Sequence, residues 1–374
     1  MKGELLPIDK YIVKLRDIIR TWSTEPIVIR DNKIENLDIY NALKTLGLKY
    51  VPIGDNNNER ISLDNLDPYR DIEEKLSGPK VYNNPLELLE KDIVTPLVKL
   101  DYIPGLNIYA KLEWYHPFSL SVKDRTALGL LKDAKERGIL DGNKKLLYEA
   151  TSTNTGIALV SMSRHFNYKT VIYLTKNIPE EIVKLFLVIY GSGVKVTKYN
   201  TTVESLGELY EDARRDNAIV LNQFENDANF RMHILTGKEI DYQLRKANIK
   251  PDAFVGSLGT SGHASAVSFY LKSRYNIRSY GVQPAKGSHI PGIRRIETGM
   301  KWVKYGEFDE IIDITYEEAL ESIMKVARST GIFPGISSGA VLSAVEKLYN
   351  EGKISGNVIV ILPDHGTKYL HQIF

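Results

Sequence analysis

Short apolar runs alternate with amphipathic stretches from about residue 146 onward. The runs are rich in β-branched residues, as buried strands are, and they lie at 145–150, 170–174, 194–199, 218–224, 252–257, 277–283 and 357–363. Between them, apolar residues recur at helical spacing and predict helices at 155–166, 180–190, 203–217, 230–247 and 261–275. This alternation predicts an α/β fold whose open sheets are mostly parallel.

The N-terminal quarter of the chain follows a different pattern. The polar stretch 54–67 and the proline-containing stretch 77–85 interrupt its helical candidates. We therefore expect residues 1–90 to form an N-terminal extension that packs on a core spanning 91–374.

Composition narrows the classes of function. The net charge of +2, from 49 basic and 47 acidic residues, gives no one-sided field for nucleic acid or an anionic membrane. The absence of cysteine excludes disulfides, thiolate metal sites and a cysteine nucleophile. The histidines show no paired metal-ligand spacing, and no apolar stretch is long enough to span a bilayer, so we expect a cytoplasmic protein without a metal site.

A glycine-rich turn follows the predicted strand at 252–257. The segment 258–263, Leu-Gly-Thr-Ser-Gly-His, leads directly into a helix, so its backbone N–H groups gather at a helix N-terminus and can bind phosphate. A plain strand-to-helix turn is the alternative, and for this segment alone the two readings are about equally supported.

A second turn of this kind, 151–156, follows the strand at 145–150. It is rich in hydroxyl and amide side chains and could bind an anion, although helix capping alone would also explain them. Both turns lie at the carboxyl ends of strands, where open α/β sheets bind ligands.

Lys123 follows a proline-led loop and opens the helical run 126–138. The helix dipole disfavours an ammonium there, which suits a lysine that reacts as a neutral amine. Taken alone, an exposed lysine paired with Asp124 is the more common arrangement.

Five segments in this order resemble the cysteine synthase and cystathionine β-synthase branch of the fold-type II pyridoxal-phosphate (PLP) enzymes, whose fold is like that of the tryptophan synthase β chain. They are PFSLSVKDR (117–125), EATSTNTG (149–156), GSLGTSGH (256–263), GISSGA (335–340) and ILPDHGTKYL (361–370). The resemblance spans residues 93–374. It implies two α/β subdomains with the cofactor in the cleft between them, a smaller mobile subdomain around 120–215, and a homodimer.

The resemblance also implies roles for single residues. Lys123 would hold PLP as a Schiff base and, once released, move the Cα proton of the substrate. Asn154 would bind the 3′-oxygen of the cofactor, and Ser337 its pyridine nitrogen. The cofactor phosphate would lie against Gly259, Thr260, Ser261, Gly262 and His263, where His263 replaces a threonine that is usual in the family. The substrate would be bound by Thr151, Ser152, Thr153, Gln223 and Phe224.

The segment 283–295 could contact the leaving group of the substrate. It places Lys286, Arg294 and Arg295 after a predicted core strand. An arginine there could bind a phosphate leaving group and select O-phosphoserine over O-acetylserine, although a solvated surface loop is the alternative. The segment IPGIRR resembles archaeal O-phosphoserine sulfhydrylases, and we expect Arg295 to bind the substrate, with Arg294 almost as well placed. The chain departs from the family pattern at Val94-Thr95 and at Thr153, which bears on substrate geometry.

The predicted reaction is β-replacement, in which O-phosphoserine or O-acetylserine and sulfide give cysteine and phosphate or acetate. A cystathionine β-synthase type of reaction with homocysteine shares the first half of this chemistry and is the first alternative. Threonine synthase fits the lysine motif less well. A non-catalytic relative is the alternative from another class, and it is disfavoured because the lysine and the glycine-rich turn are both intact.

Overall fold

The computed structural model describes residues 4–54, 59–77, 80–140 and 142–373. Parts of the two polar N-terminal stretches, 55–58 and 78–79, lie outside the described residues. The larger of two main sheets has the strand order β13-β12-β11-β14-β6-β5. Its strands are β5 (Leu97–Leu100), β6 (Leu106–Leu112), β11 (Ala253–Ser257), β12 (Arg278–Pro284), β13 (Glu310–Ile314) and β14 (Gly356–Leu362). All neighbouring pairs are parallel except β5 with β6, so the predicted α/β fold with mostly parallel sheets is confirmed.

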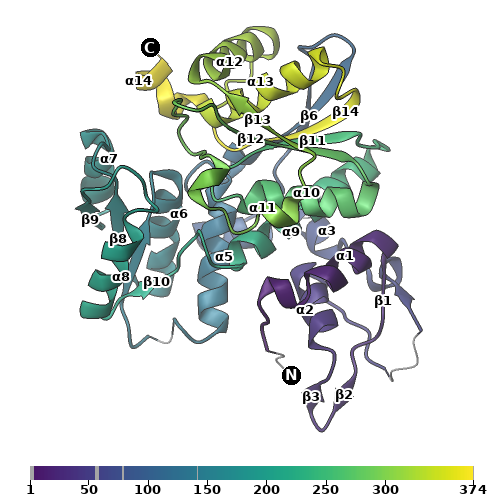
Figure 1. Ribbon diagram of the computed structural model, residues 1–374. Helices are drawn as coiled ribbons and strands as arrows, with labels where there is room; N and C mark the ends of the chain where they lie inside the picture. Colours follow the sequence, from purple (N-terminus) through teal and green to yellow (C-terminus); the bar gives the residue numbers. More distant parts are fainter. Residues whose placement is uncertain (1–3, 55–58, 78–79, 141, 374) are drawn as a thin grey trace.

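Helices cover both faces of this sheet (Figure 1). Alternate residues of β14 point to opposite faces, with Val358 and Val360 in the core under α12 and α13, and Ile359 and Ile361 in the core under α9 and α10. The helices on and around this sheet are α9 (Ala228–Lys246), α10 (Gly262–Tyr275), α11 (Val303–Gly306), α12 (Tyr316–Thr330), α13 (Ile336–Asn350) and α14 (Leu370–Ile373).

The second main sheet is fully parallel, with the order β10-β7-β8-β9. Its strands are β7 (Leu146–Ala150), β8 (Lys169–Leu174), β9 (Gly193–Val196) and β10 (Ile219–Val220), and the helices around it are α5 (Lys123–Glu136), α6 (Asn154–Ser163), α7 (Glu180–Lys184) and α8 (Leu206–Arg215). Helix α5 packs on both α6 and α9, so it lies between the two sheets (Figure 1).

Each predicted strand and helix is observed, with three informative differences. The predicted strand 218–224 is short because the backbone N–H groups of Asn222 and Gln223 donate to the carboxylate of Glu149, at 3.0 and 3.1 Å, and Asn222 is left-handed. The predicted helix 180–190 continues beyond α7 as a π-helix, η5 (Leu185–Ile189). Strands β5, β6 and β13 were not identified from sequence, and β6 was obscured by the charged Lys111 within it.

The N-terminal region contains short elements that surround two longer helices. They are η1 (Ile8–Lys10), α1 (Ile12–Thr21), β1 (Ser23–Thr24), β2 (Ile29–Arg30), β3 (Lys33–Ile34), α2 (Leu37–Thr45), β4 (Ile61–Ser62), η2 (Leu63–Leu66), α3 (Arg70–Leu76) and α4 (Pro85–Lys91). Leu15, Ile18 and Ile19 lie on one face of α1 and pack with residues of α9 and α10.

A buried lysine adds a polar contact to this apolar surface. Lys238 of α9 is almost fully buried, and its ammonium donates to the carbonyl oxygen of Leu46 at 2.8 Å and to Asp71 at 2.7 Å. Both acceptors belong to the N-terminal region, which therefore neutralises a charge of the core. Among the described helices, none is long and apolar enough to cross a membrane.

The packing of α1 can be tested with two residues of the same helix. Leu15 is fully buried whereas Val13 is 79% exposed. We expect Leu15→Ala to lower the free energy of unfolding by about 2–5 kcal/mol, because it leaves a cavity against α10. Val13→Ala should change it by less than about 0.5 kcal/mol. Urea unfolding of both variants measures the difference, and equal values would contradict the packing described here.

Candidate active site

The segments singled out from sequence meet at the carboxyl ends of the parallel strands. The loop after β14 is central, because Pro363 accepts a hydrogen bond from the backbone N–H of Val122 at 2.9 Å, and Asp364 accepts one from that of Gly335 at 2.9 Å. The lysine loop, the C-terminal motif and the N-terminus of α13 are thereby joined. This is the edge at which doubly wound sheets bind ligands.

Lys123 is the first residue of α5, as predicted. The pKa of its amine is lowered to about 8, chiefly by burial; Asp364 and Glu113 oppose this shift, and the charge of Lys368 contributes to it. An amine with this pKa is about one-tenth neutral at pH 7, several hundred times more than an ordinary lysine. Lys123 is half-buried, and its amine is more readily available in the neutral form than that of an exposed lysine.

Asp364 and Asn154 lie next to one another beside this lysine. Asn154 Nδ2 donates to Asp364 Oδ2 at 2.8 Å, and the hydroxyl of Tyr369 donates to the same oxygen at 2.5 Å. Asp364 also abuts the N-terminus of α13, where a Cβ on Gly335 would lie only 2.1 Å from Oδ1. Ser337, in the first turn of α13, is buried.

The glycine-rich turn between β11 and α10 has the close backbone approaches that its sequence suggested. A Cβ on Gly259 would lie 2.5 Å from the carbonyl oxygen of Gly292, and one on Gly262 would lie 2.4 Å from Asn229 Oδ1. Ser261, the N-cap of α10, has a left-handed φ of 68°. The turn thus has a fixed shape at the N-terminus of α10, where helix N–H groups can bind an anion.

Asn229 of α9 ties this turn to the segment after β10. Its Nδ2 donates to Thr260 Oγ1 at 2.9 Å and to the carbonyl oxygen of Gln223 at 2.8 Å. Gln223 in turn donates to Ala150 and accepts from Thr155 Oγ1 at 2.9 Å. Sequence reasoning missed Asn229, since nothing in the pattern of α9 distinguishes it.

The substrate loop after β7 combines buried and accessible side chains. Thr151 is buried, Thr153 is half-buried as the N-cap of α6, and Ser152 is exposed. Burial raises the pKa of Glu149, just before this loop, to about 7, although two backbone N–H groups oppose the shift. Glu149 holds Gln223 beside the loop.

His263, the second residue of α10, is buried against His233, with ring centroids 5.9 Å apart. Burial and the charge of Lys123 lower the pKa of His263 to about 3, so its imidazole is neutral in the structure described here.

The buried polar atoms at this edge fit an anionic ligand with additional polar atoms. Several have no hydrogen-bond partner within the described residues, namely Ser257 Oγ, Ser261 Oγ, His263 Nε2, Arg294 Nη1, Ser338 Oγ and Asp364 Oδ1. Buried polar atoms are normally paired, because leaving one unpaired is costly. A phosphorylated pyridine aldehyde such as PLP carries groups for such atoms: phosphate oxygens, a ring oxygen and a ring nitrogen.

The structure does not support our preference for Arg295 as the substrate-binding arginine. Arg295 donates to Asp313 and Glu297, both at 2.9 Å, and to the carbonyl oxygen of Pro284. Its charge is therefore neutralised away from the site. Arg294 is the residue that turns toward it, since its Nε donates to the carbonyl oxygen of Gly259 at 3.0 Å and its guanidinium lies 4.9 Å from the ring of Phe224.

A buried ionic network lies beneath the lysine. Arg125 donates to Glu113 through Nε at 2.8 Å and to Glu239 through Nη1 at 3.0 Å. Burial opposes ionisation of both carboxyls, but the charge of Arg125 outweighs it, together with His116 at Glu113 and Lys111 at Glu239. The pKa of Glu113 is held well below its usual range and that of Glu239 falls to about 2.

Thr95 completes the network. Its Oγ1 donates to Glu113 at 2.7 Å and accepts from Arg125 Nη2 at 3.0 Å. Thr95 is one of the positions at which the chain departs from the family pattern, and it lies in the ionic network beneath helix α5. Sequence reasoning placed Arg125 in a motif but gave it no role, and the partner Glu239 carried no signal.

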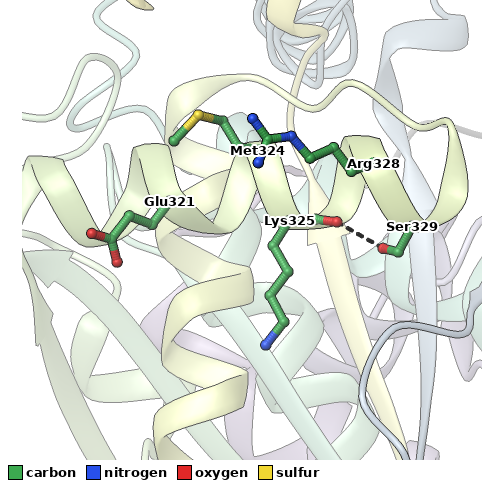
Figure 2. A pocket seen from close by; sticks show the side chains of 5 residues that line it. All are labelled: Glu321, Met324, Lys325, Arg328 and Ser329. Atoms are coloured by element: carbon green, nitrogen blue, oxygen red, sulfur yellow. Dashed lines mark hydrogen bonds between the residues drawn. The ribbon is translucent and has the colours of Figure 1, made fainter.

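A shallow depression elsewhere on the molecule takes no part in this site (Figure 2). Its lining comes entirely from helix α12, and consists of Glu321, Met324, Lys325, Arg328 and Ser329. The helix lies on the face of the large sheet opposite α9 and α10 (Figure 1).

The ionic network can be tested with two arginines at the ends of α5. We expect Arg125→Leu to lower the free energy of unfolding by about 3–5 kcal/mol, because it leaves two buried carboxylates without a partner. Arg137 is itself exposed, and its buried partner Asp133 keeps a second ion pair with Arg231, so Arg137→Leu should cost less than about 1 kcal/mol. Denaturant titration of both proteins distinguishes the two, and a small loss for Arg125→Leu would contradict the assignment.

Comparison with known proteins agrees with this geometry. Residues 89–364 match a family described as pyridoxal-phosphate dependent enzyme. Cysteine synthase B of Pseudomonas aeruginosa is 35% identical over 284 residues, which cover 74% of this chain and 93% of the relative. Cysteine synthase A of Escherichia coli is 31% identical, with 74% and 91% covered.

Solved structures show the same relationship. A hydrogen sulfide-producing enzyme from Fusobacterium nucleatum superposes with a TM-score of 0.69 at 31% identity, covering 78% of this chain and all of the other. Cysteine synthase from Entamoeba histolytica gives a TM-score of 0.67 at 30% identity, with 79% and 92% covered. This chain belongs to the family of pyridoxal-phosphate-dependent enzymes that includes the cysteine synthases.

Proposed function

We propose that this chain is a cysteine synthase that replaces the β-substituent of a serine derivative with sulfide, and that O-phospho-L-serine is its preferred substrate. The observation that carries the proposal is the half-buried Lys123 amine of lowered pKa, at the same sheet edge as the glycine-rich turn before α10. The named cysteine synthases among its relatives support the reaction type. The products are cysteine and phosphate, or acetate when O-acetylserine is used.

Different residues of the chain would bind the cofactor, bind the substrate and transfer the proton. Bound PLP supplies an electron sink that acidifies the Cα proton of the substrate and favours loss of its β-substituent. Lys123 would hold the cofactor through its amine, and the same Nζ would accept the Cα proton. Asn154 and Ser337 would hold the cofactor ring, while the turn at 259–263 would hold its phosphate. Thr151, Ser152, Thr153 and Gln223 would bind the substrate carboxylate.

Arg294 supports the preference for a phosphorylated substrate. No carboxylate among the described residues pairs with its guanidinium, and burial lowers its pKa from the ordinary value. A desolvated cation with free N–H groups favours a dianionic leaving group, because charge grows on that group as it departs. Phe224 beneath the guanidinium fixes its plane.

We also propose how the chain is organised in action. Residues 1–90 act as an extension on a catalytic core of 91–374, and the region around 120–215 closes over the substrate to exclude water. Two copies form a homodimer.

The reaction is tested directly with purified protein, sulfide and each serine derivative. We expect the protein to be yellow and to form cysteine, and Lys123→Ala to lose both properties because the amine that attaches PLP is gone. Lys132→Ala is the matched control, since Lys132 is an exposed residue of the same helix that pairs with Glu90. Cysteine formation by Lys123→Ala, or none by the unaltered protein with any serine derivative, would refute the proposal.

Substrate selection is tested by the two neighbouring arginines. We expect Arg294→Ala to reduce kcat/KM for O-phosphoserine about 100-fold, equivalent to about 2.7 kcal/mol, and to change that for O-acetylserine less than about threefold. Arg295→Ala should leave the ratio of the two substrates unchanged, because Arg295 is bound to Asp313 and Glu297. An equal loss with both substrates in Arg294→Ala would contradict the selector role.

A further inference from the structure

Lys368 is a second lysine at the proposed cofactor site. It lies in η7 (Gly366–Tyr369), the helical turn after β14. Its Nζ donates to Asn154 Oδ1 at 2.8 Å, to the carbonyl oxygen of Leu120 at 3.1 Å, and to that of Ser119. An ammonium has three N–H donors, so these three contacts use its full capacity.

The contact with Lys368 determines which end of the Asn154 carboxamide faces which neighbour. A carboxamide has an accepting end and a donating end of nearly equal shape. The cation at Oδ1 makes the reverse orientation unfavourable, because Nδ2 would then face an ammonium. Nδ2 is left to donate on the opposite side, where it now meets Asp364 at 2.8 Å.

The contacts with Ser119 and Leu120 hold the turn that leads into Lys123. Leu120 has a left-handed φ of 49°, which costs a residue with a side chain about 1–2 kcal/mol. Lys368 binds the carbonyl groups of this residue and of the one before it, so it stabilises the strained turn. Three positions farther on, the chain presents the amine of Lys123.

We propose that Lys368 is a positioning residue that orients the Asn154 amide with its NH₂ group toward the cofactor ring oxygen and holds the turn that presents Lys123. The inference rests on the cofactor site of the proposed function. It extends that function, because neither the order of the motifs nor the family match gives Lys368 a role.

The charge of Lys368 has a second effect on the same site. Lys123 is surrounded by Asp364, Glu113 and Lys368, and by the neutral imidazole of His263. Burial is the main cause of its lowered pKa, and Lys368 adds to that effect whereas the two carboxylates oppose it. Without Lys368, the Lys123 amine would remain protonated to higher pH.

A double-mutant cycle tests the orientation of Asn154. Cofactor is removed from the full-length protein, and the dissociation constant for PLP is measured by equilibrium dialysis without substrate. We expect Lys368→Met to weaken binding about tenfold in the unaltered background and less than twofold in an Asn154→Ala background, because the two residues act as one unit. Lys368→Arg should restore most of the affinity, and Lys325→Met, an exposed lysine on α12, should have no effect.

The rate of covalent PLP capture, followed against pH, tests the second effect. In the unaltered protein the rate should rise with a midpoint near the Lys123 pKa of about 8. The midpoint should move to higher pH in Lys368→Met and remain in place in Lys368→Arg. If Lys368→Met does not fold, Lys368→Gln is measured against the same criteria.

Equal losses of affinity in both Asn154 backgrounds, or an unchanged pH midpoint, would overturn the inference. Both measurements need no substrate, so they are independent of whether the protein makes cysteine. Failure of the Lys368 proposal is therefore distinguishable from failure of the proposed function.

Discussion

The guanidinium of Arg125 lies between two buried carboxylates, Glu113 after strand β6 and Glu239 on helix α9. Such a group tolerates little displacement, because any gap exposes an unpaired charge to an apolar interior. Arg125 is in the first turn of α5, two residues after Lys123. The position of the Lys123 amine relative to the large sheet is therefore fixed by an ionic contact, while the glycine-rich turn is fixed independently by β11 and α10.

Close backbone contacts join the other parts of the site. Gly259 approaches the carbonyl oxygen of Gly292 so closely that no side chain fits, and Arg294 follows two residues later with a bond to the Gly259 carbonyl. Direct contacts thus hold two parts of the site together. They are the turn that is expected to bind the cofactor and the arginine that is expected to bind the substrate. A change of glycine at 259 would disturb both at once.

The periodicity of apolar residues in the sequence predicted the α/β fold, because it follows which positions are buried. The motifs at strand ends predicted which segments come together at one edge of the sheets. It could not rank Arg294 and Arg295, since adjacent residues of an irregular segment have no periodicity that assigns a direction to their side chains. Asn229, Glu239 and Lys368 were missed for a related reason. Each acts through a contact more than 30 positions away along the chain, which local pattern does not encode.

The adjacent residues Lys238 and Glu239 pair with different parts of the chain. Lys238 pairs with Asp71 of the N-terminal region, and Glu239 pairs with Arg125. The family match begins at residue 89, after every acceptor that Lys238 uses. Without the N-terminal region, the ammonium of Lys238 would lose both of these acceptors while it remained on helix α9. Removal of the N-terminal region would therefore leave an uncompensated charge on α9 one position away from Glu239, the partner of Arg125.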